Sequence, residues 1–346
     1  MSDERPNILL LMTDQQRGDA LGIEGHPVLQ TPYLDALAAA GARFRHAYSA
    51  TPVCIPARRT LMAGQRAASH GVFMNYTAPL PGPTLPGELS KAGYQTHLVG
   101  KLHLSPPRKL YGFDSADWSD SPSPHPAYDD YERFLVESGV TTPGAGLAHG
   151  ASVNGYTARP YHLDERFHFS NWCADRALSF LARRDPTMPF FLKVSFHQPH
   201  QPLTPPAAYW DRYRAMDIPP PPVADWSRVY ETPQRGLPVN AWRVCLEPEL
   251  QRQMQAGYYG CINHIDDQIG RILARIPFLL RAPARLDLGR GVVANAPVEL
   301  MDVMPTLLDL AGVPIPEEVD GTCCPSSAAS PRAVTSCTAS VRAWRP

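Results

Sequence analysis

The sequence predicts an α/β fold in which a doubly wound, mostly parallel sheet carries helices on both faces. The apolar run over 7–13 is typical of a strand that is buried on both faces of such a sheet, and the runs 95–100 and 189–196 are also strand-like. Segments with helical periodicity separate these runs, as the crossover connections of parallel strands require. Polar or charged residues follow each run directly, at the edge where open α/β sheets bind their ligands.

Length and charge narrow the class of protein. A chain of 346 residues has the length of about two domains or of one large α/β domain, and a hydrophobic content of 44% is ample for a core. The formal net charge of -1 and the interspersed charges disfavour a nucleic-acid-binding or a polybasic membrane protein. We therefore expect neither nucleic acid nor a membrane among its partners.

The N-terminus and the cysteines predict a cytoplasmic location. The first residues lack the basic start and the small-residue cleavage site of a secretory signal, and the apolar run that follows is too short to span a membrane. Seven irregularly spaced cysteines without a C-x-x-C pair are not typical of a disulfide framework.

Between the first two predicted strands the chain alternates helices and a further strand. Thr31 and Pro32 are favourable first residues for a helix that Gly41 ends. A short strand is expected at 44–50, and the segment 59–64 is helical. A helix at 85–92, closed by a glycine, then precedes the strand at 95–100.

The second half predicts long loops and three helices. The region 105–166 is rich in Pro, Ser, Gly and Asp without a sustained period, so we expect loops over the sheet. Helical periodicity marks 172–182, 248–275 and 298–310, the second of these with an apolar residue at every third or fourth position.

One junction in this order lacks the residues of a connection. The long helix runs directly into a strand-like segment at 277–282, with no polar loop between the two. Beyond Gly321 the sequence becomes an irregular run of Ser, Thr and Cys. We therefore predict one catalytic unit over 1–321, shortened near 275–278, and a disordered tail over 322–346.

The segment 51–60 places Cys54 on a proline-marked turn before a helical pattern. Backbone N–H groups and the positive end of the helix dipole favour an anion there, and Arg58 adds a positive charge one turn further on. A cysteine alone is typically a buried structural residue, so only its surroundings decide its role.

Those surroundings are four residues that follow predicted strands: Asp14, Lys101, His103 and His200. The carboxyl ends of the strands of a doubly wound sheet meet in one crevice. A carboxylate, a cysteine, cations and histidines suit a substrate with an oxyanion such as sulfate or phosphate. Without that context Asp14 is more typical of a turn or cap, and His103 of a hydrogen-bonded structural histidine.

Six segments in order resemble the sulfatase family. The most specific is Cys54-Ile-Pro-Ala-Arg58, a C-x-P-x-R signature followed by Gly64. The others are 6–15, 31–37, 100–103, 199–202 and 302–312. The resemblance covers about 5–321, and close relatives include the arylsulfatases and the phosphonate monoester hydrolases of the alkaline phosphatase superfamily. It implies an alkaline phosphatase-like sheet, with the family's small C-terminal subdomain largely missing.

The resemblance also implies a reaction, the hydrolysis of small sulfuric esters. In sulfatases a separate maturation enzyme converts the cysteine that matches Cys54 to formylglycine, whose hydrate has two hydroxyls on one carbon. One hydroxyl attacks sulfur while a divalent cation, Ca²⁺ or Mg²⁺, and basic residues stabilise the leaving alcohol and the charged oxygens. The other then loses its proton and expels sulfate, which regenerates the aldehyde.

By position in the family, Asp14 and the modified Cys54 would bind the metal and Arg58 would hold the hydrate. Lys101, His103 and His200 would contact the sulfate and assist proton transfer. Two neighbours have no assigned role: Gln15, where many members have a second aspartate, and His197.

The departure from the family lies at the junction already noted. Members carry there a strand ending in Ser-Asp-His-Gly or a similar run, and later a lysine; together these complete the metal and sulfate sites. No Asp-His or Asp-Asn pair stands there in this chain. Two alternatives therefore stay open: a phosphate or phosphonate monoester hydrolase, and a catalytically impaired sulfatase remnant that lacks half of the metal site.

Overall fold

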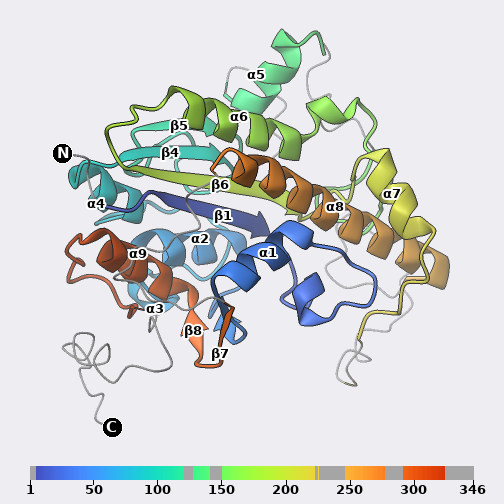
Figure 1. Cartoon of the computed structure of the whole chain (residues 1–346), viewed down its shortest axis with the longest axis horizontal. Coiled ribbons are helices and arrows are strands. Elements are labelled where there is room, and N and C mark those ends of the chain that lie inside the picture. Colours follow the sequence, from blue (N-terminus) through green and yellow to red (C-terminus); the bar gives the residue numbers. More distant parts are fainter. Residues whose placement is uncertain are drawn as a thin grey trace.

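A four-stranded parallel sheet forms the centre of the molecule (Figure 1). The computed structural model describes residues 5–120, 128–140, 150–222, 225, 246–276 and 291–323. The strand order is β1-β6-β4-β5. Their bounds are Ile8–Asp14 for β1, Gln95–Gly100 for β4, Ser115–Trp118 for β5 and Phe190–Pro199 for β6. The three strands expected at 7–13, 95–100 and 189–196 are confirmed, and so is the fold class.

The strand β6 is the middle of the sheet, and all ten of its residues are buried. It pairs in parallel with β1 through Leu10 and with β4 through Leu98, both opposite Lys193. Since neighbouring parallel strands end at the same edge, the carboxyl ends of β1, β6 and β4 lie next to one another.

Helices cover both faces of this sheet (Figure 1). On one face, α2 (Cys54–Ala63), α4 (Leu85–Lys91) and α9 (Val303–Ala311) pack their apolar side chains against Leu98 and Phe191. This arrangement is half of the doubly wound architecture.

On the other face lie α6 (Phe169–Arg183), α8 (Pro248–Ala274) and α1 (Pro32–Ala40), which pack against strand residues that include Val99 and Leu192. The remaining helices are η1 (Gly22–Glu24), α3 (Ala67–His70), η3 (Glu165–Phe167) and α7 (Ala207–Arg214). No helix in the described ranges has both the length and the apolar character needed to cross a bilayer.

The prediction of loops alone over 105–166 is wrong. The edge strand β5 forms there because it pairs with β4, and α5 (Asp130–Glu137) forms because Asp129 caps its first turn. Neither element has a long apolar run, so the sequence pattern did not reveal them.

Two other elements differ from their predictions. The expected strand at 44–50 is two short strands, β2 (Ala42–Phe44) and β3 (Ala47–Tyr48). They pair with β7 (Val292–Ala294) and β8 (Val298–Glu299) in two small sheets. The helix expected from 298 begins only at Val303, after a 3-10 turn η5 (Leu300–Asp302) with a capping box of Glu299 and Asp302.

The long helix is confirmed, since α8 ends at Ala274 with Arg275 as its cap. The strand expected at 277–282 lies outside the described residues, and so does the predicted tail from residue 324 onward. The missing connection at 275–278 therefore stays a prediction.

Candidate active site

The structure brings Asp14, Arg58 and Lys101 into one buried ion cluster at the carboxyl edge of the sheet. Asp14 Oδ2 lies 2.6 Å from Lys101 Nζ and 3.1 Å from Arg58 Nη2. Both cationic side chains are only 2% exposed. Burial by itself raises the pKa of Asp14, but the charges of Arg58 and Lys101 hold it well below its usual range. Asp14 is therefore ionised throughout the neutral range.

Arg58 ties together three strands at this edge. Besides Asp14 of β1, its Nη1 donates to the Lys101 carbonyl just after β4 (2.8 Å) and to Ser195 Oγ of β6 (3.1 Å). The planar guanidinium donates in several fixed directions at once, which a lysine does not. Arg58 thus sets the relative position of the loops that leave the sheet.

Cys54 is the first residue of α2, not a residue ahead of it. Asn75 Oδ1 accepts the next backbone N–H, that of Ile55, at 2.9 Å, and so takes up one of the open donors of the helix start. The Cys54 Sγ lies 3.8 Å from Asp14 Oδ1. Burial and the charge of Asp14 raise the pKa of this thiol, so the helix end does not make it a thiolate.

The histidines near the cluster are neutral imidazoles at neutral pH. Burial, and then the charges of Lys101 and Arg58, lower the pKa of His103 to about 4. Burial likewise lowers the pKa of His200, and that of His197 strongly. None of them is a cation that could pair with an anion at pH 7.

The tautomers of two of these rings follow from their partners. His200 Nδ1 and His197 Nε2 both face the Gln201 carbonyl, at 2.8 and 2.9 Å, and a carbonyl only accepts. Each of those nitrogens therefore carries the hydrogen, and His200 Nε2 has a free lone pair. The His200 backbone N–H also donates to the Asp14 carbonyl (2.9 Å), which fixes the loop after β6 on β1.

Sequence reasoning did not single out three residues around this cluster, of which Lys193 and Ser195 are buried. Ser195 and Lys193 lie on β6 at alternate positions, and Asp120 follows β5. Within the described ranges Lys193 Nζ has no hydrogen-bond partner. Burial, and then the charge of Arg58, lower the pKa of Lys193 far below its ordinary value. The period of two in β6 was the available signal, since it places Lys193 and Ser195 on one face.

The donors near Asp14 do not make a complete site for a hard cation. Ca²⁺ and Mg²⁺ take about six oxygen ligands. No group of three or more His, Cys, Asp or Glu side chains suited to a metal occurs among the residues that the structure describes. Asp14 Oδ2 is already shared by Lys101 and Arg58. The described residues therefore do not fit the family's metal.

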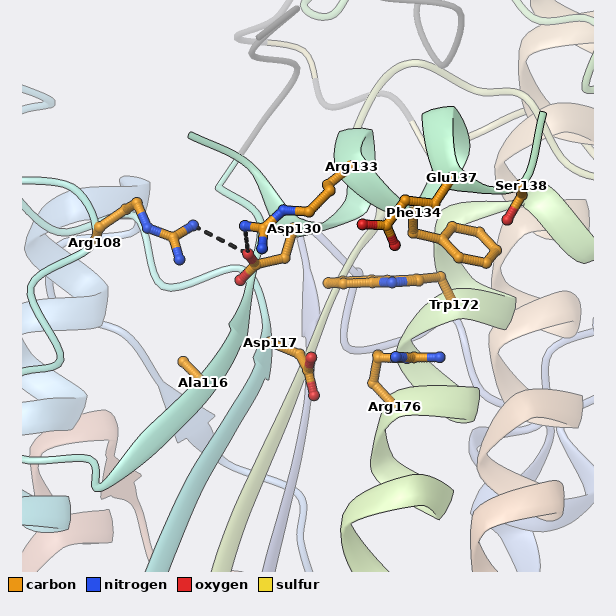
Figure 2. Close-up of a pocket in the computed structure, with 10 residues that line it drawn as sticks. All are labelled: Arg108, Ala116, Asp117, Asp130, Arg133, Phe134, Glu137, Ser138, Trp172 and Arg176. Carbon is orange, nitrogen blue, oxygen red and sulfur yellow. Dashed lines mark hydrogen bonds and ion pairs between the residues drawn. The ribbon is translucent and has the colours of Figure 1, made fainter. Parts of the chain in front are cut away.

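A separate cavity of about 450 Å³ lies at the outer edge of the sheet (Figure 2). Arg108 and Arg133 converge there on Asp130, and Trp172 and Arg176 approach it from α6. The other lining residues are Ala116, Asp117, Phe134, Glu137 and Ser138. None of the predicted site residues lines it, so it is distinct from the ion cluster.

Comparison with known proteins decides the family. The family model described as Sulfatase matches residues 6–277, more than half of the chain. The chain belongs to the sulfatase family. This sulfatase is 34% identical to the arylsulfatase of Clostridium perfringens over 376 aligned positions, which cover 92% of this chain and 77% of the relative. It is 27% identical to the choline-sulfatase of Rhizobium meliloti, covering 92% and 70%.

Solved structures agree with this sulfatase in fold. The phosphonate monoester hydrolase of Agrobacterium radiobacter has a TM-score of 0.71 at 22% identity, covering 89% of this chain and 74% of that one. A structure solved with its substrate D-glucosamine-2-N,6-O-disulfate has a TM-score of 0.65 at 19% identity, covering 92% and 79%. The predicted sulfatase resemblance is confirmed, and by family the chain is a hydrolase of sulfate esters.

Two features of these matches concern how much of the family this chain contains. The family match ends at residue 277. The alignment with the C. perfringens enzyme spans 376 positions, more than the 346 residues of this sulfatase, so that relative carries residues without a counterpart here.

Proposed function

We propose that the chain hydrolyses small sulfuric esters at the ion cluster, with a formylglycine made from Cys54 by a maturation enzyme. The observation that carries this is the position of Cys54 at the start of α2, beside Asp14 and one turn from Arg58. The formylglycine supplies, when formed, the hydroxyl that attacks sulfur.

The side chains around position 54 have separable tasks in this proposal. Arg58 and Asp14 hold the group at position 54 in place, since they surround it and are themselves fixed by buried hydrogen bonds. Lys101 places its ammonium where the charged oxygens of the substrate gather. Electrostatic stabilisation of the oxyanion is thus the part of the reaction that this chain supports best.

Proton transfer falls to the neutral imidazoles. His200 Nε2 has an available lone pair, because Nδ1 carries the hydrogen. His103 Nδ1 is buried and has no partner within the described part of the chain. We propose both as proton acceptors during the reaction. His197 donates to a carbonyl and contacts the His200 ring, which suits a supporting residue.

The described residues offer few ligands for a divalent cation. Ca²⁺ or Mg²⁺, as the family implies, would have Asp14 and the oxygen at position 54 as ligands. These are too few for firm binding, so we assign no step to a metal. The expected cytoplasmic location stays a prediction from the N-terminal sequence.

The test uses the full chain co-expressed with a maturation enzyme, with the conversion of Cys54 verified by mass. Aryl sulfate, phosphate and phosphonate esters are compared on one preparation. We expect measurable hydrolysis of the sulfate ester and none by Cys54→Ala. Preferential cleavage of the phosphorus esters would favour the alternative reading, and unchanged activity of Cys54→Ala would remove Cys54 from the reaction.

A further inference from the structure

Asp120 holds the turn that presents two of the proposed site residues. Its Oδ1 accepts the backbone N–H of Leu102 at 2.6 Å and that of His103 at 2.5 Å. One carboxylate oxygen thus holds two successive amides of the segment that leaves β4. The two partners come from different strands, since Asp120 follows the edge strand β5.

The turn has a backbone that needs such support. His103 has φ of 52°, in the left-handed region that L-residues other than glycine rarely adopt. Such a conformation is unfavourable for a residue other than glycine and persists only where the surrounding structure holds it. The same turn begins at Lys101, whose ammonium reaches Asp14. Any relaxation of the turn therefore moves the ammonium and the imidazole together.

The electrostatics agree with this geometry. Burial raises the pKa of Asp120, whereas the N–H groups of His103 and Leu102, and then Arg58 and Lys101, work against that rise. The two amides and the two cations therefore favour the charged carboxylate, the stronger acceptor for both amides.

We propose that Asp120 is a positioning residue for sulfate-ester hydrolysis, which fixes the turn 101–103 so that Lys101 and His103 face the group at position 54. The inference rests on the proposed function. It adds a residue that acts only through its neighbours and touches neither the nucleophile nor the substrate.

The chain offers a matched control in Asp129. This carboxylate is buried and, like that of Asp120, accepts two successive backbone N–H groups, those of Tyr131 and Glu132, both at 3.0 Å. Its carboxylate caps α5 and also lies beside Ser119, and it makes no hydrogen bond to the turn 101–103, all of which the structure describes. Asp129→Ala therefore removes the same kind of contact as Asp120→Ala, a carboxylate that accepts two backbone N–H groups, but leaves the acceptor of the turn 101–103 in place.

The experiment compares Asp120→Ala, Asp120→Asn and Asp129→Ala in the mature full chain. The measurements are thermal unfolding, kcat and KM for an aryl sulfate, calorimetric binding of inorganic sulfate, and the ring resonances of the histidines by NMR.

We expect Asp120→Ala to lower kcat about 100-fold, because misplacing a reacting group by about 1 Å costs that much. Asp120→Asn should recover most of this loss, since its amide oxygen still accepts both N–H groups. Asp129→Ala should stay within about 3-fold of wild type.

The His103 resonances should move in Asp120→Ala and keep their positions in Asp129→Ala. Wild-type kinetics and unmoved His103 resonances in Asp120→Ala would overturn the proposal, and so would an equal loss of kcat in Asp129→Ala. If Asp120→Ala fails to fold, Asp120→Asn decides the test. An Asn variant that folds but loses kcat about 100-fold, the loss expected of Asp120→Ala, contradicts the geometric role. If the wild type neither cleaves sulfate esters nor binds sulfate, the proposed function fails, and the NMR comparison alone decides whether Asp120 positions the turn.

Discussion

Arg58 connects three segments of the site through the hydrogen bonds of one side chain. Its guanidinium is almost fully buried and donates to a carboxylate, a carbonyl and a hydroxyl that belong to three separate segments. Removing one member of a buried ion pair leaves the other charge without compensation, which is costly. The residue is therefore as important for the fold of this edge as for the reaction proposed there.

We predict that Arg58→Lys destabilises the chain by about 3 kcal/mol, because a lysine keeps the charge but cannot reach three acceptors. Urea unfolding measures the change in the free energy of unfolding. Arg66→Lys is the control, since Arg66 is 55% exposed and its nearest pair atom, in Asp320, is 3.7 Å away. Equal effects of both substitutions would show that the three donations of Arg58 carry no special weight.

Sequence reasoning at the residue scale reached the residues that directly follow strands. Asp14, Lys101 and His200 were predictable because strand ends meet at one edge, and Cys54 and Arg58 because they form a motif. Ser195 and Asp120 were not, because their contacts depend on the exact register of β6 and on a short edge strand. The structure places the predicted residues together, while their roles in the reaction stay proposals.

At the scale of the elements, the strand β6 is unusual because it buries a lysine in the centre of the sheet. Lys193 lies in its middle with an amine that has no hydrogen-bond partner in the described ranges. Burial of an ammonium disfavours its charged form, which is why the pKa of Lys193 is far below the ordinary value of 10.5. Folding therefore shifts this side chain toward the neutral amine, with release of its proton.

This release predicts a pH dependence of stability. Between the lowered pKa of Lys193 in the folded chain and its ordinary value of 10.5, the unfolded chain binds a proton there that the folded chain does not, so stability rises with pH across that window. We expect Lys193→Met to be more stable than wild type at pH 7 and to lose a slope of up to about 1.4 kcal/mol per pH unit. Thermal unfolding between about pH 7 and pH 10 measures it.

Lys91→Met serves as the reference for that experiment, because its ammonium is 73% exposed and pairs with Glu88 on the surface. The reference should keep the wild-type slope. A slope that survives in Lys193→Met would assign the pH dependence to another group.

The elements with strong apolar patterns were predictable, whereas β5, α5 and the paired short strands were not. Long-range pairing creates β2 and β3, since each is two or three residues long and pairs with a strand about 250 residues away in sequence. Local composition carries no signal for such pairs.

For the whole molecule, the connection that we predict to be missing after α8 would have a consequence for metal binding. The described residues supply one carboxylate to the cluster, and two cations already neutralise it. We predict that millimolar Ca²⁺ or Mg²⁺ raises the melting temperature of the mature chain by less than about 2 °C, because ligand-induced stabilisation scales with affinity. A larger rise that EDTA reverses would show that further ligands come from residues beyond those described.

We expect the same shortage of metal ligands to limit the reaction rate. We predict that the mature chain cleaves an aryl sulfate at least about 100-fold more slowly than the arylsulfatase of C. perfringens, since a metal contributes several kcal/mol of charge stabilisation. Parallel steady-state assays on proteins of verified mass measure the ratio of kcat/KM. Comparable rates would contradict the impaired-remnant reading. The DNA sequence across codons 275–278 would show whether the gene itself lacks the connection.

The central position of β6 also determines at which stage of unfolding the arrangement of the site is disrupted. The strand that forms the centre of the core continues into His197 and His200 and holds Arg58 through Ser195. A local opening that frees these groups would have to break the pairing of β6 with β1 and β4. Inactivation by denaturant should therefore coincide with global unfolding, and the slowest-exchanging amides of the chain should include those next to the site.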